Sequence, residues 1–301
     1  MRTVSALVYV VFLTCFAAAQ APAPLTAPPE GSANRVAEPL YRVTVVSRTT
    51  KAINYGHLGD PTKVGLKGTV LMTDAQGEAR VESKRGAVEI EAKINHLGTP
   101  TRFGPEYLTY VLWAISPEGR PVNLGELVAD PSDKAKVKVS TDLQAFALIV
   151  TAEPYFSVMQ PSDVVVMENV VLPGTLGRVQ EMDAKYELLP RGHFTYDTGA
   201  PQTAQVGAKL SMGEYEALVA TYQAQNAIQI ARAAGADKYA AGTLQKAEQL
   251  YRQAVDMQAK KPSSRQIVTM AREAAQAAED ARAISTKRQS ETSAAAAPPR
   301  S

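Results

Sequence analysis

The segment Val88-Glu89-Ile90-Glu91-Ala92-Lys93-Ile94 decides the first half of the fold. Apolar and charged residues alternate along it without interruption. Because successive side chains of a β-strand point to opposite faces of a sheet, the pattern predicts a strand with one buried and one solvated face. The tripeptide Lys84-Arg85-Gly86 precedes it and predicts a tight turn from a partner strand that opens at Val81.

Short segments with a period of two continue from Leu40 to about Val171, and turns rich in Gly, Pro and Asp separate them. Tyr107 to Ile115 is instead a nearly continuous apolar run, as expected of a central strand buried on both faces. Other predicted strands are Tyr41–Val46, Val122–Val128, Ala135–Val139, Ala145–Ala152, Val164–Val171 and a weaker one within Val179–Leu189. The set predicts an antiparallel, immunoglobulin-like β-sandwich over residues 39–189.

At Met212 the apolar period changes to alternating steps of three and four residues, which is typical of helices with a heptad seam. Three consecutive segments keep this period. Gly235 ends the first, Asp237 begins the second, and Pro262 separates the second from the third. Connections this short require antiparallel neighbours, so the sequence predicts an antiparallel three-helix coiled-coil bundle over residues 212–290. The seam positions include Ala217, Ala220, Ala224, Ala227, Ala231, Ala247, Leu250, Ala254, Ile267, Ala274, Ala277 and Ala281.

The N-terminus has the pattern of an export signal. Arg2 precedes an apolar stretch, Val4–Ala19, that is shorter than the roughly 20 residues of a membrane-spanning helix. Small residues at its end predict a signal peptide, residues 1–19, cleaved between Ala19 and Gln20; a retained membrane anchor is the alternative. Cys15 is the only cysteine and lies inside this segment, so the mature chain would have neither a disulfide nor a thiolate site.

Three segments lack an apolar period. We expect residues 20–38 to be a disordered Pro/Ala linker, residues 190–211 to link the two domains, and residues 291–301 to be a disordered tail. The net charge of +2 over 301 residues, with acidic and basic residues interspersed, gives no electrostatic basis for nucleic-acid binding. No later segment has transmembrane length, so we expect no membrane span after signal cleavage.

Part of the sandwich segment resembles the C-terminal extracytoplasmic domain of anti-sigma-K-type factors. The resemblance is carried by Tyr110-Val111-Leu112-Trp113, by Gly119-Arg120-Pro121 and by Val150-Thr151-Ala152-Glu153-Pro154. It implies a β-sandwich. The predicted signal peptide stands where those factors have their cytoplasmic sigma-binding domain, which argues against control of a sigma factor.

The helical segment, roughly residues 212–290, resembles an uncharacterised helical domain of exported envelope proteins that often precedes an OmpA-like module. The resemblance is carried by Ala231 to Ala240 and by Leu244, Ala247, Leu250 and Ala254. It implies a periplasmic or outer-membrane-associated protein. Because the sequence contains no such module after the helices, peptidoglycan binding is not implied.

One short motif occurs twice, as His57-Leu58-Gly59-Asp60-Pro61-Thr62-Lys63 and as His96-Leu97-Gly98-Thr99-Pro100-Thr101-Arg102. If the flanking strands pair, His57, Lys63, His96 and Arg102 would meet at one end of the sandwich and suit an anionic ligand or a metal ion. The alternative is favourable turn chemistry used twice. No third ligand has suitable spacing, so the sequence predicts no metal centre and no cofactor.

We expect a protein without enzymatic activity, because the motifs of nucleophilic hydrolases, zinc proteases and nucleotide-binding enzymes are missing from the sequence. Trp113 fits a core position, and Arg272-Glu273 and Glu279-Asp280 are typical of a solvated helix face. The predicted function is a structural or protein-interaction protein of the cell envelope, whose helices bind other envelope proteins or a second copy through a flank of the seam. The alternatives are a small-molecule, glycan or metal-binding module and an unrecognised hydrolase.

Overall fold

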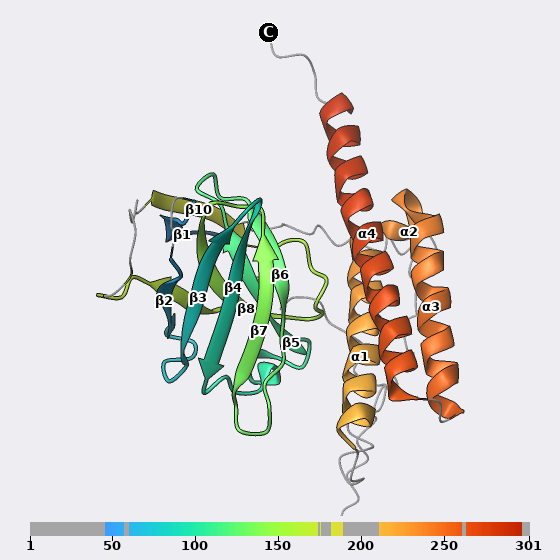
Figure 1. Cartoon of the computed structure of the whole chain (residues 1–301). Coiled ribbons are helices and arrows are strands. Elements are labelled where there is room, and N and C mark those ends of the chain that lie inside the picture. The colour runs from blue at the N-terminus through green and yellow to red at the C-terminus, as the bar shows by residue number, and fades with distance from the viewer. Residues whose placement is uncertain are drawn as a thin grey trace, which may run out of the picture. The chain divides into compact units, whose positions relative to one another are not determined.

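Ten β-strands form the first half of the described chain, and helices form the second half (Figure 1). The computed structural model describes residues 46–56, 60–173, 175, 182–188, 211–260 and 263–296. The predicted signal peptide, the 20–38 linker, all of the predicted strand Tyr41–Val46 except Val46, and nearly all of the 190–211 linker lie outside these residues. The described β-strands and helices belong to one compact unit, Val43–Ser301.

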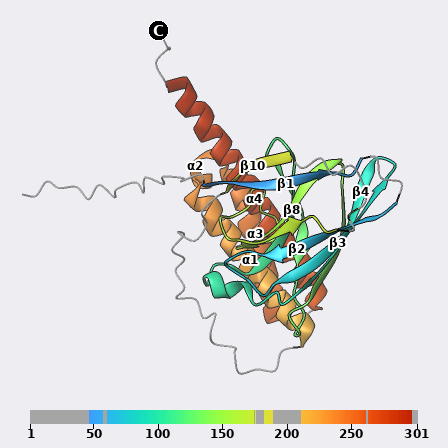
Figure 2. The ribbon, with the colours of Figure 1, turned by 90° about the vertical axis from the view of Figure 1, so that its left-hand side faces the viewer.

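The strands pair antiparallel in one sheet that curls into a nearly closed barrel (Figures 1 and 2). Its main path is β6-β5-β8-β9-β2-β3-β4-β7, and the β1–β10 pair branches from β8. The path's two end strands approach each other, since a methyl group on Gly125 of β6 would lie 3.5 Å from Val139 Cγ1 of β7. The strands are β1 (Val46–Asn54), β2 (Thr62–Gly68), β3 (Gln76–Lys84), β4 (Ala87–Asn95), β5 (Thr109–Ile115), β6 (Pro121–Leu127), β7 (Ala135–Thr141), β8 (Ala145–Glu153), β9 (Val165–Val170) and β10 (Met182–Leu188).

The β3–β4 hairpin has the predicted geometry. Lys84 pairs with Ala87, so the turn is Arg85-Gly86, and Gly86 has the positive φ of 81° that this turn needs. The apolar residues of β4 are buried, whereas Glu89 forms an ion pair with Lys84 at 2.9 Å. The alternating pattern therefore predicted both the strand and its solvated face.

Strand β2 was not predicted, and β3 begins at Gln76 rather than at Val81. Glycine is unfavourable in strands, and Gly65 and Gly68 interrupt the apolar pattern of β2. Neighbours fill the space beside Gly65, because a methyl group there would lie 2.7 Å from Val170 Cγ2. Packing against the neighbouring strands thus outweighs the low strand propensity of the glycines in β2.

Every residue of β5 is buried, as predicted for Tyr107 to Ile115. Its side chains divide between two clusters. Leu112 and Ala114 belong to the cluster enclosed by the barrel. Val111, Trp113 and Ile115 belong to a second cluster that also contains the buried residues of the helices. The outer face of β5 is therefore covered by a second layer, and Trp113 is a core residue of that layer.

Four helices follow, rather than three: α1 (Met212–Ala233), α2 (Ala236–Tyr239), α3 (Ala241–Ala259) and α4 (Ser264–Ala296). Gly235, with φ of 79°, follows α1 as predicted. The second predicted helix is wrong at its start, since Ala240 (φ −145°) separates the single turn of α2 from α3. Arg288 of α4 donates to the carbonyl of Tyr239 at this break, so a tertiary contact replaces a helical one.

Helix α4 continues to Ala296, so residues 291–296 are helical instead of part of a disordered tail. The segment has no Gly or Pro before Pro298 and ends in alanines, which are the strongest helix formers. None of the helices in the described part of the chain combines the length and apolar character that a membrane span requires.

Helices α1 and α4 run side by side in the same direction. At one end a methyl group on Gly213 would lie 3.2 Å from Ser264 Cβ, and at the other Gln289 Nε2 donates to Ala234 O at 2.6 Å. Small side chains allow this close approach, because the predicted seam alanines are buried in both helices. Ser211 and Glu214 form a capping box at the start of α1. The buried seam residues include Ala217, Ala220, Ala224, Ala227, Ala231, Ala274, Ala277 and Ala281.

Two of the tyrosines buried in the barrel interior differ in whether the hydroxyl has a hydrogen-bond partner. Tyr110 donates its hydroxyl to Gly98 O at 2.8 Å, whereas the hydroxyl of fully buried Tyr55 has no partner among the described residues. An unpaired buried hydroxyl costs stability.

We predict that Tyr55→Phe raises the free energy of unfolding by up to about 1 kcal/mol, or leaves it unchanged, and that Tyr110→Phe lowers it by about 1 kcal/mol. Denaturant titration checks this, and a larger loss at Tyr55 than at Tyr110 would contradict it.

Candidate functional site

The structure describes three of the four predicted ligand residues; His57 lies outside the described residues. Lys63, on β2, forms an ion pair with Glu78 at 2.8 Å. The register of β2, β3 and β4 places Lys63 level with Glu91, whereas His96 follows the end of β4. Lys63 and His96 therefore lie at different heights of the sheet, and the structure does not bring them together.

His96 is exposed and lies close to a different residue, Asp133. Both have φ of 58°, and Leu97 N donates to Asp133 O at 2.9 Å. Arg102 belongs to the short 3-10 helix η1 (Pro100–Phe103), and its guanidinium lies 5.5 Å from the centre of the Phe103 ring. No group of three or more His, Cys, Asp or Glu side chains that would hold a metal ion occurs in the described part of the chain.

The main cluster of buried polar groups lies elsewhere, around the connection between β8 and β9. We call residues 154–164 the joint loop. Most of it is buried, and Tyr155 and Val158 belong to the apolar cluster shared with the helices. Buried backbone requires hydrogen-bond partners. Side chains from both the strands and the helices provide them.

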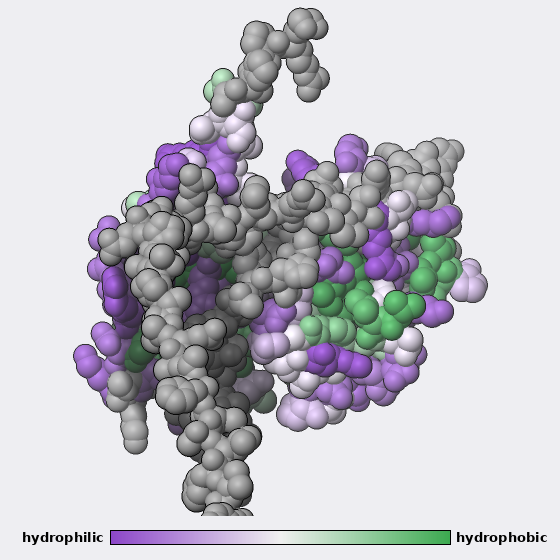
Figure 3. All heavy atoms as spheres, turned by 180° about the vertical axis from the view of Figure 1, so that it is seen from behind, coloured by the Kyte–Doolittle hydropathy of each residue, from purple (hydrophilic) through white to green (hydrophobic). Residues whose placement is uncertain are grey.

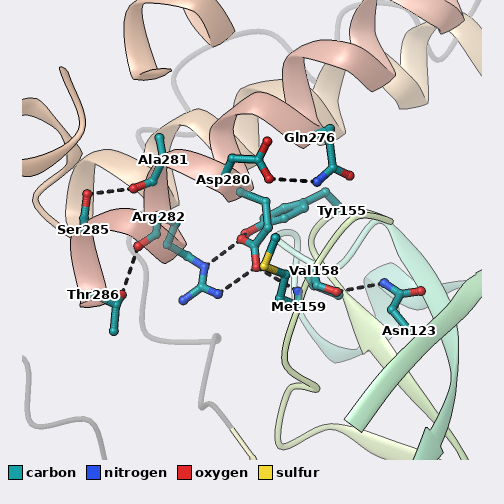
Figure 4. A network of polar contacts seen from close by, with 11 residues as sticks. Asn123, Tyr155, Val158, Met159, Gln276, Asp280, Ala281, Arg282, Ser285 and Thr286 are labelled. Atoms are coloured by element: carbon teal, nitrogen blue, oxygen red, sulfur yellow. Dashed lines mark hydrogen bonds and ion pairs between the residues drawn. The ribbon is translucent and has the colours of Figure 1, made fainter. Parts of the chain in front are cut away.

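Glu279 of α4 makes the central contact with the joint loop. Figure 4 labels its partners Tyr155, Met159 and Arg282. Its carboxylate is fully buried. Oε2 accepts from the Tyr155 hydroxyl at 2.6 Å and from Arg282 Nε at 2.7 Å, and Oε1 accepts from Met159 N at 2.8 Å and from Arg282 Nη2 at 2.7 Å. Burial opposes the charge of Arg282, but the bonds to Glu279 outweigh it and hold the pKa of the guanidinium above its usual value. The paired charges thus attach α4 to the loop.

Glu126 of β6 is a carboxylate of the sheet that bonds to side chains of the helices. Its Oε1 accepts from Thr109 Oγ1 at 2.7 Å and from Gln223 Nε2 of α1 at 2.8 Å. Its Oε2 forms an ion pair with Arg272 of α4. Gln223 Oε1 accepts from Phe156 N at 2.9 Å, and the Arg272 guanidinium lies 4.4 Å from the centre of the Phe156 ring. One carboxylate therefore connects β6, α1 and α4.

A third buried carboxylate fixes the base of the joint loop. Glu153 Oε1 accepts from Ser162 N at 2.7 Å and from Thr151 Oγ1 at 2.6 Å. Thr151 Oγ1 in turn accepts from Trp113 Nε1 at 2.8 Å. The only tryptophan of the chain is thereby tied to the loop that carries the helix contacts.

Two asparagine side chains bind carbonyl groups of the joint loop. Asn123 Nδ2, on β6, donates to Phe156 O at 2.9 Å and to Val158 O at 2.8 Å. Asn226 Nδ2, on α1, donates to Pro154 O at 3.3 Å. The loop is therefore held from the sheet side and from the helix side.

The contacts around the joint loop hold segments of the chain in place, and the carboxylates that take part in them bond to other groups of the same chain. The sequence interpretation of a solvated face was wrong for Glu279, which is fully buried, whereas the side chain of Arg272 is 42% exposed while it pairs with Glu126. The signal was present: Glu279 lies between seam residues Ala277 and Ala281, and Arg282 follows at the i+3 position of an ion pair.

The proposed open flank of the helical seam is covered as well. The buried alanines of α1 and α4 share one apolar cluster with Trp113, Tyr155 and Val158. The chain's own sheet and joint loop therefore occupy the place that a partner helix would take.

No family model and no curated protein matches this chain. The resemblances to anti-sigma-K-type factors and to the helical envelope domain therefore remain predictions.

We predict that Glu279→Gln lowers the free energy of unfolding by about 3 kcal/mol, because it leaves the buried Arg282 without its counter-charge. Glu273→Gln, on an exposed position of the same helix, should change it by less than about 0.5 kcal/mol. Denaturant titration of both variants checks the difference. Equal, small effects of both substitutions on the free energy of unfolding would show that the contacts around the joint loop contribute little to stability.

Proposed function

We propose that the chain is a non-enzymatic structural or protein-interaction protein of the cell envelope, exported to the periplasm and associated there or at the outer membrane. The proposal is based on the set of contacts around the joint loop, which we call the joint. Two carboxylates, Glu126 and Glu279, hold the helices against the sheet and the joint loop, and a third, Glu153, fixes the base of that loop. A site for acid-base chemistry would instead keep such groups beside a substrate pocket.

Export is supported by the apolar stretch Val4–Ala19 and its small-residue end. The absence of a cysteine after Cys15 fits a chain that does not depend on disulfides in an oxidising compartment. We also propose the finer fold of the sequence analysis: a sandwich of the anti-sigma-K-type and an antiparallel three-helix coiled coil, with the barrel-like curvature and α2 as local departures.

We propose α3 as the helical surface that meets other envelope proteins. The α1–α4 flank is covered by the chain's own sheet, so it cannot serve this role in the folded unit. The outer side of α3 is exposed and mostly polar, with Val255 as its large apolar residue at 39% exposure. Protein interfaces combine an apolar centre with a polar rim, and Val255 with the polar residues around it offers both kinds of side chain.

The test uses a photo-crosslinking amino acid in living cells, at Val255 on α3 or, as a matched control, at Lys84 in the β3–β4 turn. We predict crosslinks to envelope proteins from position 255 and not from position 84. Mass measurement of the same purified chain should give an N-terminus at Gln20. Crosslinks from both positions, or to cytoplasmic proteins, would contradict the proposal.

A ligand-binding module remains the second candidate, and one observation favours it. His96 and Asp133 both adopt left-handed backbone conformations side by side, with Arg102 in the following segment. Such conformations are costly for residues other than glycine and concentrate at functional sites. A thermal-shift screen with metals, glycans and anions, compared between the parent and His96→Ala/Arg102→Ala, tests it. Equal shifts in both proteins would exclude this site.

A further inference from the structure

Three side chains of different chemistry meet at one carboxylate oxygen between the sheet and the helices. Glu126 Oε1 accepts from the Thr109 hydroxyl at 2.7 Å and from the Gln223 side-chain amide at 2.8 Å. Thr109 is 4% exposed, Gln223 is 3% exposed, and the side chain of Glu126 is 8% exposed. A hydroxyl, a carboxamide and a carboxylate are thus held together where little water reaches them.

The three groups have the chemistry of an acyl transfer within the chain. The Thr109 hydroxyl is the nucleophile, and it already donates its proton to the carboxylate of Glu126, which is the general base. Gln223 is the acyl donor, and its Nε2 donates to the same carboxylate oxygen, which can return the proton to this nitrogen as it leaves. Gln223 Oε1 accepts from Phe156 N at 2.9 Å, so a backbone donor is in place for the negative charge that develops on this oxygen.

We infer that Thr109 and Gln223 become joined by an ester bond. Thr109 Oγ1 bonds to Gln223 Cδ, the Cδ–Nε2 bond breaks, and the hydroxyl proton passes through Glu126 to the nitrogen, which leaves as ammonia. Glu126 returns to its starting state, and the step needs no oxidant, cofactor or external substrate. Because it occurs once in each chain, it differs from enzymatic turnover, and it is independent of the partner surface proposed on α3.

The fixed arrangement compensates for the low reactivity of these groups. A carboxamide is a poor acyl donor in water, but well-oriented groups in intramolecular reactions reach effective concentrations of roughly 10⁵–10⁸ M. Arg272 pairs with the second oxygen of Glu126, which fixes the carboxylate between β6 and the helices. Escape of ammonia into the solvent removes the leaving group and opposes the reverse reaction.

A second pair of a threonine and a carboxylate lacks the acyl donor. Thr151 Oγ1 donates to Glu153 Oε1 at 2.6 Å, and both residues are fully buried. The other side chain that bonds to Thr151 is Trp113, whose indole contains no acyl group. We expect no ester at Thr151, which makes this residue the matched control.

The ester would connect β5 to α1 and fix the helices on the sheet covalently. In the view of Figure 3, the described helical residues present mainly hydrophilic side chains, so the contacts that hold the helices lie on their inner side. Cys15 is the only cysteine, so a disulfide within the chain cannot make this connection. The ester supplies a covalent bond of another kind.

Peptide mapping of the folded full chain by mass spectrometry tests the inference. We expect protease digestion to release one joined peptide that contains Thr109 and Gln223 and is lighter than its two parts together by one ammonia molecule. Alkaline hydroxylamine, which cleaves esters, should separate the two parts. An N-terminal Gln20 can also lose ammonia by cyclisation, so the joined peptide decides the outcome and the mass of the intact chain does not.

Substitutions separate the ester from other sources of the same mass. Thr109→Val and Glu126→Gln should abolish the joined peptide, and Thr151→Val should leave it unchanged. Thr109→Ser should retain it, because this variant keeps the hydroxyl; circular dichroism checks that each variant is folded. Separate, unmodified Thr109 and Gln223 peptides from the parent chain would overturn the inference, and so would a joined peptide that persists in Thr109→Val.

Discussion

The apolar outer face of the central strands β5 and β8 is the constraint on which the rest of the structure depends. Both strands already bury their inner side chains in the barrel, yet Val111, Trp113 and Ile149 point into a second cluster. Leaving such a face in water would cost roughly 25 cal/mol for each Å² of apolar surface. The helices and the joint loop cover it. The β domain and the helical region are for this reason one compact unit, although their sequence patterns differ completely.

Because the joint loop helps to cover this face, its own backbone groups need hydrogen-bond partners within the protein. The joint loop passes between sheet and helices, and its backbone groups lose their contact with water. Glu279 and Gln223 accept from its amides, and Asn123 and Asn226 donate to its carbonyls. Glu126 and Glu279 thereby bond the sheet and the joint loop to the helices.

Much of the fold follows from local sequence patterns. The alternation in Val88–Ile94, the apolar run ending at Ile115 and the alanine seams each report which faces are buried, so the strands and helices could be predicted. The contacts around the joint loop could not be predicted, because they connect residues far apart in the chain: the position of Glu279 in the helical seam indicates burial, but nothing in the local sequence indicates Tyr155 as its partner. The break at Ala240 has the same kind of cause, a contact from α4. The His57 and His96 motifs suggested a common site on local similarity alone, and the register shows that sequence repetition does not imply proximity.

Equilibrium unfolding followed by two probes tests the central claim most directly. Trp113 is the only tryptophan and reports on the outer face of β5, whereas far-ultraviolet circular dichroism is dominated by the helices. If the helices are the second layer that this face requires, both signals should change together in a single transition with the same midpoint. Loss of the helical signal at a lower denaturant concentration, with the emission of Trp113 unchanged, would show that the sheet is stable without its helical cover and would contradict the account.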